Sequence, residues 1–267
     1  MHLQLPARGK KHEEFCVTPR DCILVKHPHK NLASTCVTCP HRASGLCGTL
    51  LGPPSEEAET EQQEAWQRFL TARAGEQLAV RNRISSDVFV VCNGWAFRYF
   101  QLADGRRQIL KFLLPGDLFS PITIFENAFH FSVKALTEVQ LSGFALPEIR
   151  VRFAVNPEVR SAIDVSCVTE SREAAELATA LGQLSAEERI AYLLLHLMSR
   201  IAKGSVIRDQ RYPFPLRQQH IADTVGLTPV HVSRVLGAFR DRRLLALSEG
   251  VLTVFNLPEL QRIGTLN

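Results

Sequence analysis

One stretch constrains the fold of this chain more than any other: LRQQHIADTVGLTPVHVSRVLGAFRDRRLL (216–245). It predicts a first helix over roughly 217–225, after which Gly226 supplies a tight turn in the left-handed region that glycine favours. Thr228 can cap a second helix, and Pro229 occupies its first position, where a missing N–H costs nothing. The stretch therefore predicts a helix-turn-helix.

The second helix separates apolar from polar positions. Four apolar residues recur at i, i+3, i+4 and i+7 and are expected to pack inward: Val232, Val235, Leu236 and Phe239. A recognition helix places its N-terminal residues at base edges in the major groove. On the opposite face we expect Arg234 to bind O6 and N7 of guanine, Ser233 to bind a base or phosphate, and Val230 to touch a thymine methyl.

The charge around this motif is positive, although the net charge of the chain is only +4. Residues 217–243 hold five arginines, which include Arg242 and Arg243, and two aspartates. Such an excess suits a DNA backbone, and we expect Arg217, Arg240, Arg242 and Arg243 to hold phosphates. On charge alone, a solvated basic face with no DNA role stays open. The candidate DNA-contacting residues are Val230, His231, Ser233, Arg234, Arg217, Thr228 and Arg240. The following segment, 244–257, predicts a β-hairpin turning at Glu249-Gly250, as a wing would.

The middle of the chain is rich in strand signals. The segments 95–102 and 106–114 flank Asp104-Gly105 and predict a hairpin, within a small antiparallel barrel or jelly roll over 76–147. Before it, Ser55 and the glutamates after it predict a helix to about Ala72. After Pro157 the period changes to 3.6, which predicts one long helix to about 181. A capping box at Ser185–Glu188 begins the next helix.

Five of the seven cysteines fall in the first fifth of the chain. The sequence has no run of eighteen apolar residues and no signal-peptide core, so we expect a cytoplasmic protein without a membrane span. Thiols stay reduced there, which favours metal or redox chemistry over structural disulfides. Residues 1–50 otherwise lack apolar periodicity and are expected to be irregular.

The chain resembles the CRP/FNR family of bacterial transcription regulators, and within it the FNR-like, rhizobial branch. The resemblance covers about 70–263 and rests on 94–119, 181–195 and 227–245. It implies an α+β fold with an N-terminal β-roll (a cyclic-nucleotide-binding-like jelly roll) as sensor domain, a long dimerisation helix and a C-terminal winged helix-turn-helix. We accordingly divide the chain into a Cys/His-rich segment and these three parts, at 1–54, 55–156, 157–182 and 183–267.

The resemblance also implies partners. These are a second copy of the chain, promoter DNA with a two-fold symmetric site, and RNA polymerase. Two recognition helices in adjacent major grooves need half-sites about 34 Å apart. No Gly-rich phosphate loop, HExxH or GxSxG motif is present, so we do not expect an enzyme.

The FNR branch carries an oxygen-labile 4Fe-4S cluster, and Cys36, Cys39 and Cys47 are similar to its N-terminal cysteine triplet. The family's fourth cysteine falls on Ser142 here. Cys92 is therefore the expected fourth ligand, with Cys22 or Cys16 as substitutes. Three alternatives remain: zinc bound by the triplet and His41, a redox-active thiol pair, or no site.

The cyclic-nucleotide branch of the family is not expected. In the stretch that would hold the nucleotide, 121–135, the sequence has no arginine and no Gly-Glu pair. A phosphate buried without a cation is costly. The resemblance therefore implies a regulator that responds to oxygen or redox state and does not depend on cAMP.

Overall fold

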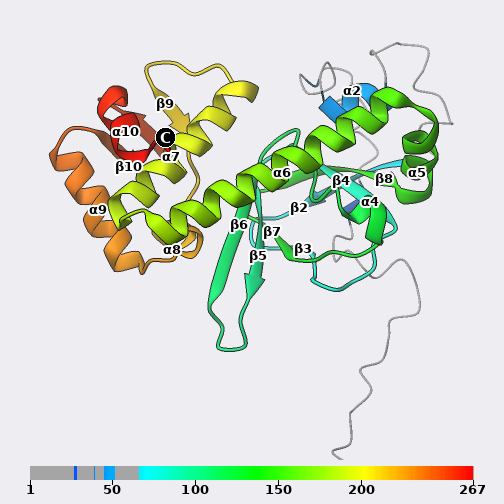
Figure 1. Cartoon of the computed structure of the whole chain (residues 1–267), viewed down its shortest axis with the longest axis horizontal. Coiled ribbons are helices and arrows are strands. Elements are labelled where there is room, and N and C mark those ends of the chain that lie inside the picture. The colour runs from blue at the N-terminus through cyan, green and yellow to red at the C-terminus, as the bar shows by residue number, and fades with distance from the viewer. Residues whose placement is uncertain (1–26, 29–38, 40–44, 52–65, 267) are drawn as a thin grey trace, which may run out of the picture.

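The computed structural model describes residues 27–28, 39, 45–51 and 66–266. Figure 1 shows a strand-rich part and a helical part joined by one long helix, α6 (Pro157–Gln183). The predicted α+β architecture, with a β-roll, a long helix and a winged helix-turn-helix, is confirmed.

Two antiparallel four-stranded sheets form the β-roll. One has the order β1-β2-β8-β4, with bounds His27–Pro28, Gln67–Ala72, Val139–Ala145 and Asp87–Asn93. The other has the order β3-β7-β5-β6, with bounds Gln77–Ala79, Ser132–Ala135, Ala96–Gln101 and Arg107–Leu113. Alternate residues of both sheets, among them Phe89, Leu141 and Val133, bury one shared apolar cluster, as strand periodicity requires.

The predicted hairpin is confirmed as β5 and β6. Gly105 in its turn has a φ of +88°, which a side chain would strain. Gly94, just before β5, is needed for a different reason. A Cβ there would lie 1.9 Å from the carbonyl oxygen of Glu138. These two glycines allow the strands to turn and to approach their neighbours.

Two expectations for the N-terminal region are wrong. The helix expected to run to Ala72 is instead strand β2 over its last six residues, because Gln67–Ala72 pairs residue for residue with the central strand β8. The region expected to be irregular contains a helix, α2 (Gly45–Leu51). Leu46 and Leu50 of α2 are buried against Val159 and Ile163 of α6, and this packing orders the helix.

A short helix, α4 (Thr123–Glu126), lies between β6 and β7, and two helices, α5 (Leu146–Val155) and α6, follow the β-roll. Asn156 caps α6, and its side chain accepts hydrogen bonds from the backbone N–H groups of Glu158 and Val159. The face of α6 that carries Val159 and Ile163 packs on its own domain, so the opposite face remains exposed.

The C-terminal part begins with α7 (Ala186–Gly204), where the predicted Ser185–Glu188 capping box is present. Its remaining elements are β9 (Arg211–Pro213), α8 (Gln218–Val225), α9 (Pro229–Asp241), β10 (Leu245–Ser248), β11 (Val251–Val254) and α10 (Leu257–Gly264). Strands β10, β11 and β9 form a small antiparallel sheet. One apolar core joins these elements to Trp95, Phe97 and Phe112 of the second sheet of the β-roll.

Candidate nucleic-acid interface

The turn between α8 and α9 has the predicted geometry. Gly226 adopts the left-handed conformation with a φ of 67°, and its N–H bonds back to the carbonyl oxygen of Ala222. The hydroxyl of Thr228 accepts a hydrogen bond from the N–H of His231 at 3.2 Å, and Pro229 is the first helical residue. The predicted helix-turn-helix is therefore confirmed, including the turn at Gly226 and the capping of α9 by Thr228.

The inner face of α9 fixes the rotation of the helix. Val232 and Phe239 are completely buried, and Val235 and Leu236 pack half-buried against the same core. Because four side chains along one stripe are anchored, α9 cannot rotate about its axis without opening the core.

The outer face of α9 is available for contact. Its exposed residues near the N-terminus of the helix are Val230, His231, Ser233 and Arg234. Val230, an apolar side chain, is 62% exposed. Within the part of the chain that the structure describes, no ion pair or side-chain hydrogen bond engages Ser233 or Arg234. The guanidinium of Arg234 is thus free to bind another molecule.

The flanking candidates are also exposed. Arg217 precedes α8, Thr228 precedes α9, and Arg240 lies in the last turn of α9, where its Nε is 3.6 Å from the carboxylate of its neighbour Asp241. Exposed cations and helix N-termini on one side of a helix-turn-helix are suited to phosphate contacts.

Arg242 differs from the other arginines of this region. Its guanidinium is bound by Glu187 of α7 and lies 3.5 Å from the carboxylate of Glu259 of α10. These contacts tie the end of α9 to two neighbouring helices. The expectation that Arg242 holds a DNA phosphate is therefore revised, because its charge is already neutralised within the domain.

The predicted wing is confirmed as strands β10 and β11. Glu249 and Gly250 form its turn with φ values of 51° and 73°. The hairpin follows α9 directly, after Arg243, whose φ of 52° turns the chain.

Two half-buried histidines have depressed pKa values. Burial, followed by the charge of Arg107, lowers the pKa of His220 to about 4. Burial, followed by the charge of Arg200, lowers that of His196 to about 4. Neutral His220 is also required locally, because its Nδ1 accepts the backbone N–H of Arg217 at 3.1 Å and so caps α8.

We predict an acid-sensitive stability from these two groups. The unfolded histidine has a pKa of about 6.5, so between pH 6.5 and 4 the unfolded chain binds protons that the folded chain does not. Their contribution is complete above pH 6.5 and decreases as the pH falls towards 4. The urea midpoint should fall between pH 7.5 and 5, and less steeply in a His196→Gln/His220→Gln variant. Equal slopes for the two proteins would contradict this assignment.

The proposed metal ligands lie mostly near the edge of what the structure describes. Cys36, Cys16 and Cys22, and also His41, fall outside the described residues. Cys39 is half-buried, and Cys47 lies on α2, where it packs against the apolar cluster that joins α2, α6 and the β-roll. Among the described residues, which include Cys39, Cys47 and Cys92, no group of three His, Cys, Asp or Glu could hold a metal ion, so the structure does not bring these three thiols together in a metal site.

Cys92 and Ser142 belong to neighbouring strands. Cys92 is half-buried in β4 at a register shift between Val91 and Asn93. Ser142 of β8 is buried and accepts a hydrogen bond from Nε2 of Gln67 at 2.8 Å. The position where the family has its fourth cysteine is thus filled by a serine that is bonded within the sheet.

Comparisons with known proteins agree with this architecture. The family described as "Cyclic nucleotide-binding domain" matches residues 69–151, and the family described as "Crp-like helix-turn-helix domain" matches residues 188–263. The "Nitrogen fixation regulation protein FixK" of Rhizobium meliloti is 30% identical over 194 residues, which is 72% of this chain and 84% of the relative. The chain belongs to the CRP/FNR family.

Other members of the CRP/FNR family extend the likeness. FixK of Bradyrhizobium diazoefficiens is 28% identical over 86% of this chain and 93% of its own length. The structure of FixK2 from Bradyrhizobium japonicum has the same fold, with a TM-score of 0.69 and 22% identity over 75% of this chain and 98% of that one. This CRP/FNR protein is a DNA-binding transcription regulator and not an enzyme. In the described residues, no helix is long and apolar enough to cross a membrane.

One feature of the interface was not predicted from the sequence, the contact between α8 and the β-roll. Sequence patterns placed the exposed residues of α9, but they gave no sign that α8 is contacted by the β-roll. The contacting residues, such as Arg107 and Asp223, are 116 positions apart in the chain. A sequence offers no local signal for a pair at that separation.

Proposed function

We propose that this regulator binds two-fold symmetric promoter DNA as a homodimer, and that it responds to oxygen or redox state through an iron–sulfur cluster held by Cys36, Cys39, Cys47 and Cys92. It would act in the cytoplasm through RNA polymerase. The observation that carries the DNA-binding part is the exposed outer face of α9, where Arg234 has no intramolecular partner among the described residues.

The half-site is proposed from the residues on that face. Arg234 has the planar fork that binds guanine through O6 and N7, and Ser233 can bond a neighbouring base or phosphate. Val230 stands where FNR-like proteins place a glutamate, so the base at that position is read by an apolar side chain. A half-site such as TTGAT, with its guanine read by Arg234, is our working hypothesis.

Replacing Arg234 by alanine is expected to weaken binding to the preferred site by about 1–3 kcal/mol and to relax the preference at one base pair. The measurement is fluorescence anisotropy on duplexes that carry each base at each half-site position. Arg240→Ala is the matched control, because loss of a phosphate contact lowers affinity for all sequences and reduces the salt dependence. A uniform loss in Arg234→Ala would show that Arg234 contacts phosphate.

The homodimer is proposed from the exposed face of α6. Val165 and Val168 are 61% and 69% exposed on this helix, and exposed Ser161 and Asp164 lie beside them. Exposed small residues continue the stripe at coiled-coil spacing towards the C-terminal end of the helix: Ser171, Ala175, Ala178 and Gly182. Small side chains let two helices approach closely, and a second copy of α6 offers the matching stripe.

The iron–sulfur part of the proposal rests on the number, spacing and surroundings of the thiols, because the described ones, Cys39, Cys47 and Cys92, do not form a metal-holding group in this structure. Cys47 is on a helix that packs directly on α6, next to a cluster that includes Val88 and Val90 of β4. Cys92 follows on the same strand, at a bulge, which is a common device for redirecting a side chain. Thiolates in half-buried, apolar surroundings suit a four-iron cluster, whose normal ligands are cysteines. When bound, such a group would supply an oxygen-labile charge centre beside the dimerisation helix.

Independence from cAMP is proposed from Arg98, a buried cation of the β-roll. Its guanidinium lies 2.7 Å from the carboxylate of Glu170 on α6, donates to the carbonyl oxygen of Phe119 and stacks 4.5 Å from the ring centre of Phe131. A nucleotide phosphate would have to displace Glu170 to reach this charge.

A further inference from the structure

The β5–β6 hairpin of the sensor domain contacts the first helix of the helix-turn-helix. Arg107 of β6 directs two N–H groups at one carboxylate oxygen of Asp223 on α8, with Nη2 at 2.5 Å and Nε at 2.8 Å. The two side chains are only 21% and 11% exposed. The other carboxylate oxygen of Asp223 accepts from Nε2 of Gln219 at 2.6 Å. The acid is therefore held in place from both sides.

Arg107 is fixed by its own sheet as well. Its guanidinium lies 4.9 Å from the ring centre of Phe97 and 5.6 Å from that of Tyr99, both on β5. Phe97 also contacts the ring of His220, at 5.7 Å between centres, near the N-terminus of α8. A cation packed on two rings and paired with a carboxylate has little rotational freedom.

A backbone contact extends this junction to the C-terminal end of α8. Nε2 of Gln108 donates to the carbonyl oxygen of Thr224 at 2.8 Å. The hairpin thus touches α8 near its beginning through His220, in its last turns through Asp223, and next to its end through Thr224. A helix held at three points can neither tilt nor slide relative to the β-roll.

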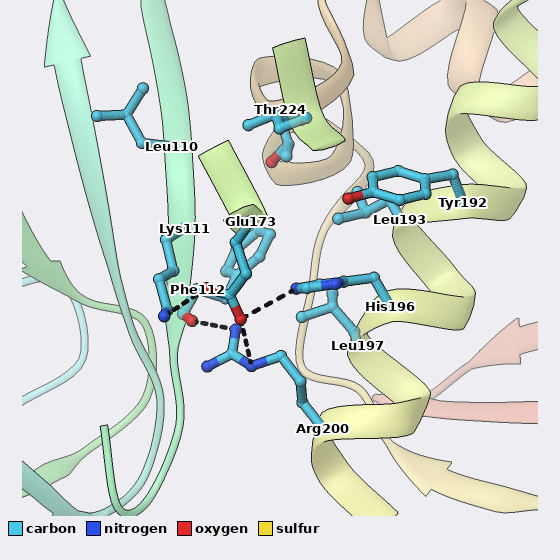
Figure 2. A pocket seen from close by; sticks show the side chains of 11 residues that line it. Leu110, Lys111, Phe112, Glu173, Tyr192, Leu193, His196, Leu197, Arg200 and Thr224 are labelled. Atoms are coloured by element: carbon cyan, nitrogen blue, oxygen red, sulfur yellow. Dashed lines mark hydrogen bonds and ion pairs between the residues drawn. The ribbon is translucent and has the colours of Figure 1, made fainter. Parts of the chain in front are cut away.

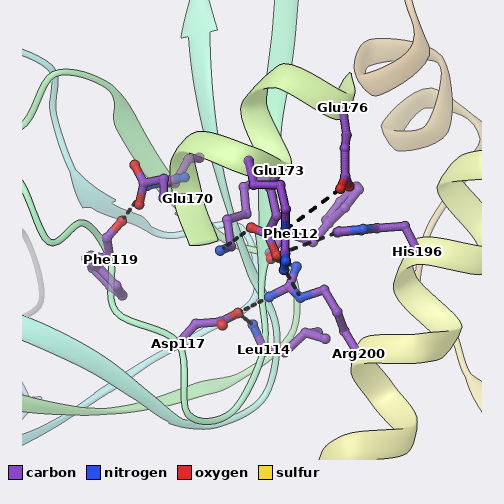
Figure 3. A network of polar contacts seen from close by, with 12 residues as sticks. Phe112, Leu114, Asp117, Phe119, Glu170, Glu173, Glu176, His196 and Arg200 are labelled. Atoms are coloured by element: carbon purple, nitrogen blue, oxygen red, sulfur yellow. Dashed lines mark hydrogen bonds and ion pairs between the residues drawn. The ribbon is translucent and has the colours of Figure 1, made fainter. Parts of the chain in front are cut away.

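A second set of contacts joins the sensor domain to α7. Arg200 of α7 is bound by Asp117 and donates to the carbonyl oxygen of Phe112 at 2.8 Å. Glu173 of α6 lies 2.5 Å from Nζ of Lys111 on β6 and 3.9 Å from Nε2 of His196 on α7 (Figure 2). Figure 3 shows Asp117 and Phe112 beside Arg200. Figure 2 shows Lys111, Glu173, His196 and Arg200 among the side chains around a small cavity of about 30 Å³, which has room for about one water molecule. The sensor domain therefore contacts both α7 and α8 of the C-terminal part.

We propose that Arg107 and Asp223 are positioning residues for DNA recognition, which fix the recognition helix relative to the sensor domain and so set the spacing between half-sites that the dimer accepts. This inference rests on the dimer and the two-fold site of the proposed function. Neither Arg107 nor Asp223 is expected to contact DNA. They act through α8, which carries α9 as one packed unit.

The physical reason is the geometry of DNA. One base pair added between half-sites moves the second by about 3.4 Å and rotates it by about 35°. A rigid dimer cannot follow such a change, whereas a dimer with loosely attached recognition helices can. Rigid attachment therefore gives a sharp preference for one spacing, and loss of the attachment broadens that preference.

The test uses the full-length protein and a palindromic duplex selected from a random pool by the wild type. Affinity is measured on this duplex, on duplexes with one or two base pairs added or removed at the centre, and on a single half-site. The wild type should lose about tenfold or more per base pair, since each 1.4 kcal/mol of misfit is tenfold. Arg107→Ala should flatten this dependence to about threefold, with single half-site affinity unchanged.

The charge-swapped variant Arg107→Asp/Asp223→Arg should restore the sharp spacing preference. The single variant Asp223→Arg is its control, because it measures any gain in non-specific DNA binding from the added cation. An Arg107→Ala protein that keeps the wild-type spacing dependence would overturn this inference and leave the proposed function standing. A wild type that binds two half-sites no better than one would overturn the two-fold site of the proposed function, and this inference with it.

Discussion

Replacing Cys39 by serine is expected to abolish both the iron–sulfur cluster and DNA binding in the absence of oxygen. Protein purified without oxygen should show a broad absorbance near about 400 nm and about four irons per chain, as Cys-ligated four-iron proteins do. One missing thiolate leaves the cluster open to solvent and to loss of iron. We propose that only the DNA-competent state of the protein holds the cluster, so loss of the cluster removes the free energy that favours this state.

The matched control is Cys167→Ser. Cys167 is half-buried on α6, and burial, together with the charges of Glu170 and Asp164, raises the pKa of its thiol. A protonated thiol is a poor ligand, so this variant should keep the absorbance and the DNA affinity. Full anaerobic DNA binding by Cys39→Ser would contradict the cluster. Colourless wild-type protein with one zinc would replace the cluster by a structural metal and leave the DNA-binding function intact.

Placing an aspartate at Val168 is expected to break the dimer. In the proposed seam the two copies of Val168 lie near the two-fold axis, so the variant would bring two carboxylates together in a partly dry interface. Like charges in such a position cost several kcal/mol, or about a hundredfold or more in dimer affinity. Sedimentation should show a monomer, and binding to a two-half-site duplex should fall to the level of a single half-site.

The control for this variant is the same change at Val206, which is 87% exposed in the segment between α7 and β9 and does not belong to the stripe on α6. Val206→Asp should leave the sedimentation profile and the DNA affinity unchanged. A dimeric Val168→Asp protein would move the dimer interface away from this face of α6.

The helix-turn-helix could be predicted almost residue by residue because its signals are local. Gly226, Thr228 and Pro229 each act within one turn of their own position, and the apolar stripe of α9 lies within eight residues. The exposed DNA-contacting face then follows from the buried one. The same holds for the β5–β6 hairpin and its Gly105 turn.

Elements whose stability comes from distant partners were predicted wrongly or missed. The sequence before β2 is rich in glutamate and favours a helix, but Gln67–Ala72 pairs with β8, about seventy residues away, and this pairing outweighs local propensity. Helix α2 is ordered by α6 in the same way. Arg242 was assigned to phosphate from its charge alone, although Glu187 and Glu259 neutralise it.

The apolar core shared by the two halves limits how such regulators can be recombined. Trp95 lies against Phe112 and Phe214, so a single cluster contains rings from the β-roll and from the segment before the helix-turn-helix. Neither half carries a complete interior of its own at this junction. A chimaera that takes its sensor from one homologue and its DNA-binding half from another must therefore match these rings in size and shape, or it will leave a void at the hinge. A change on the exposed face of α9 alters the DNA contact alone, whereas a change in these rings affects both halves.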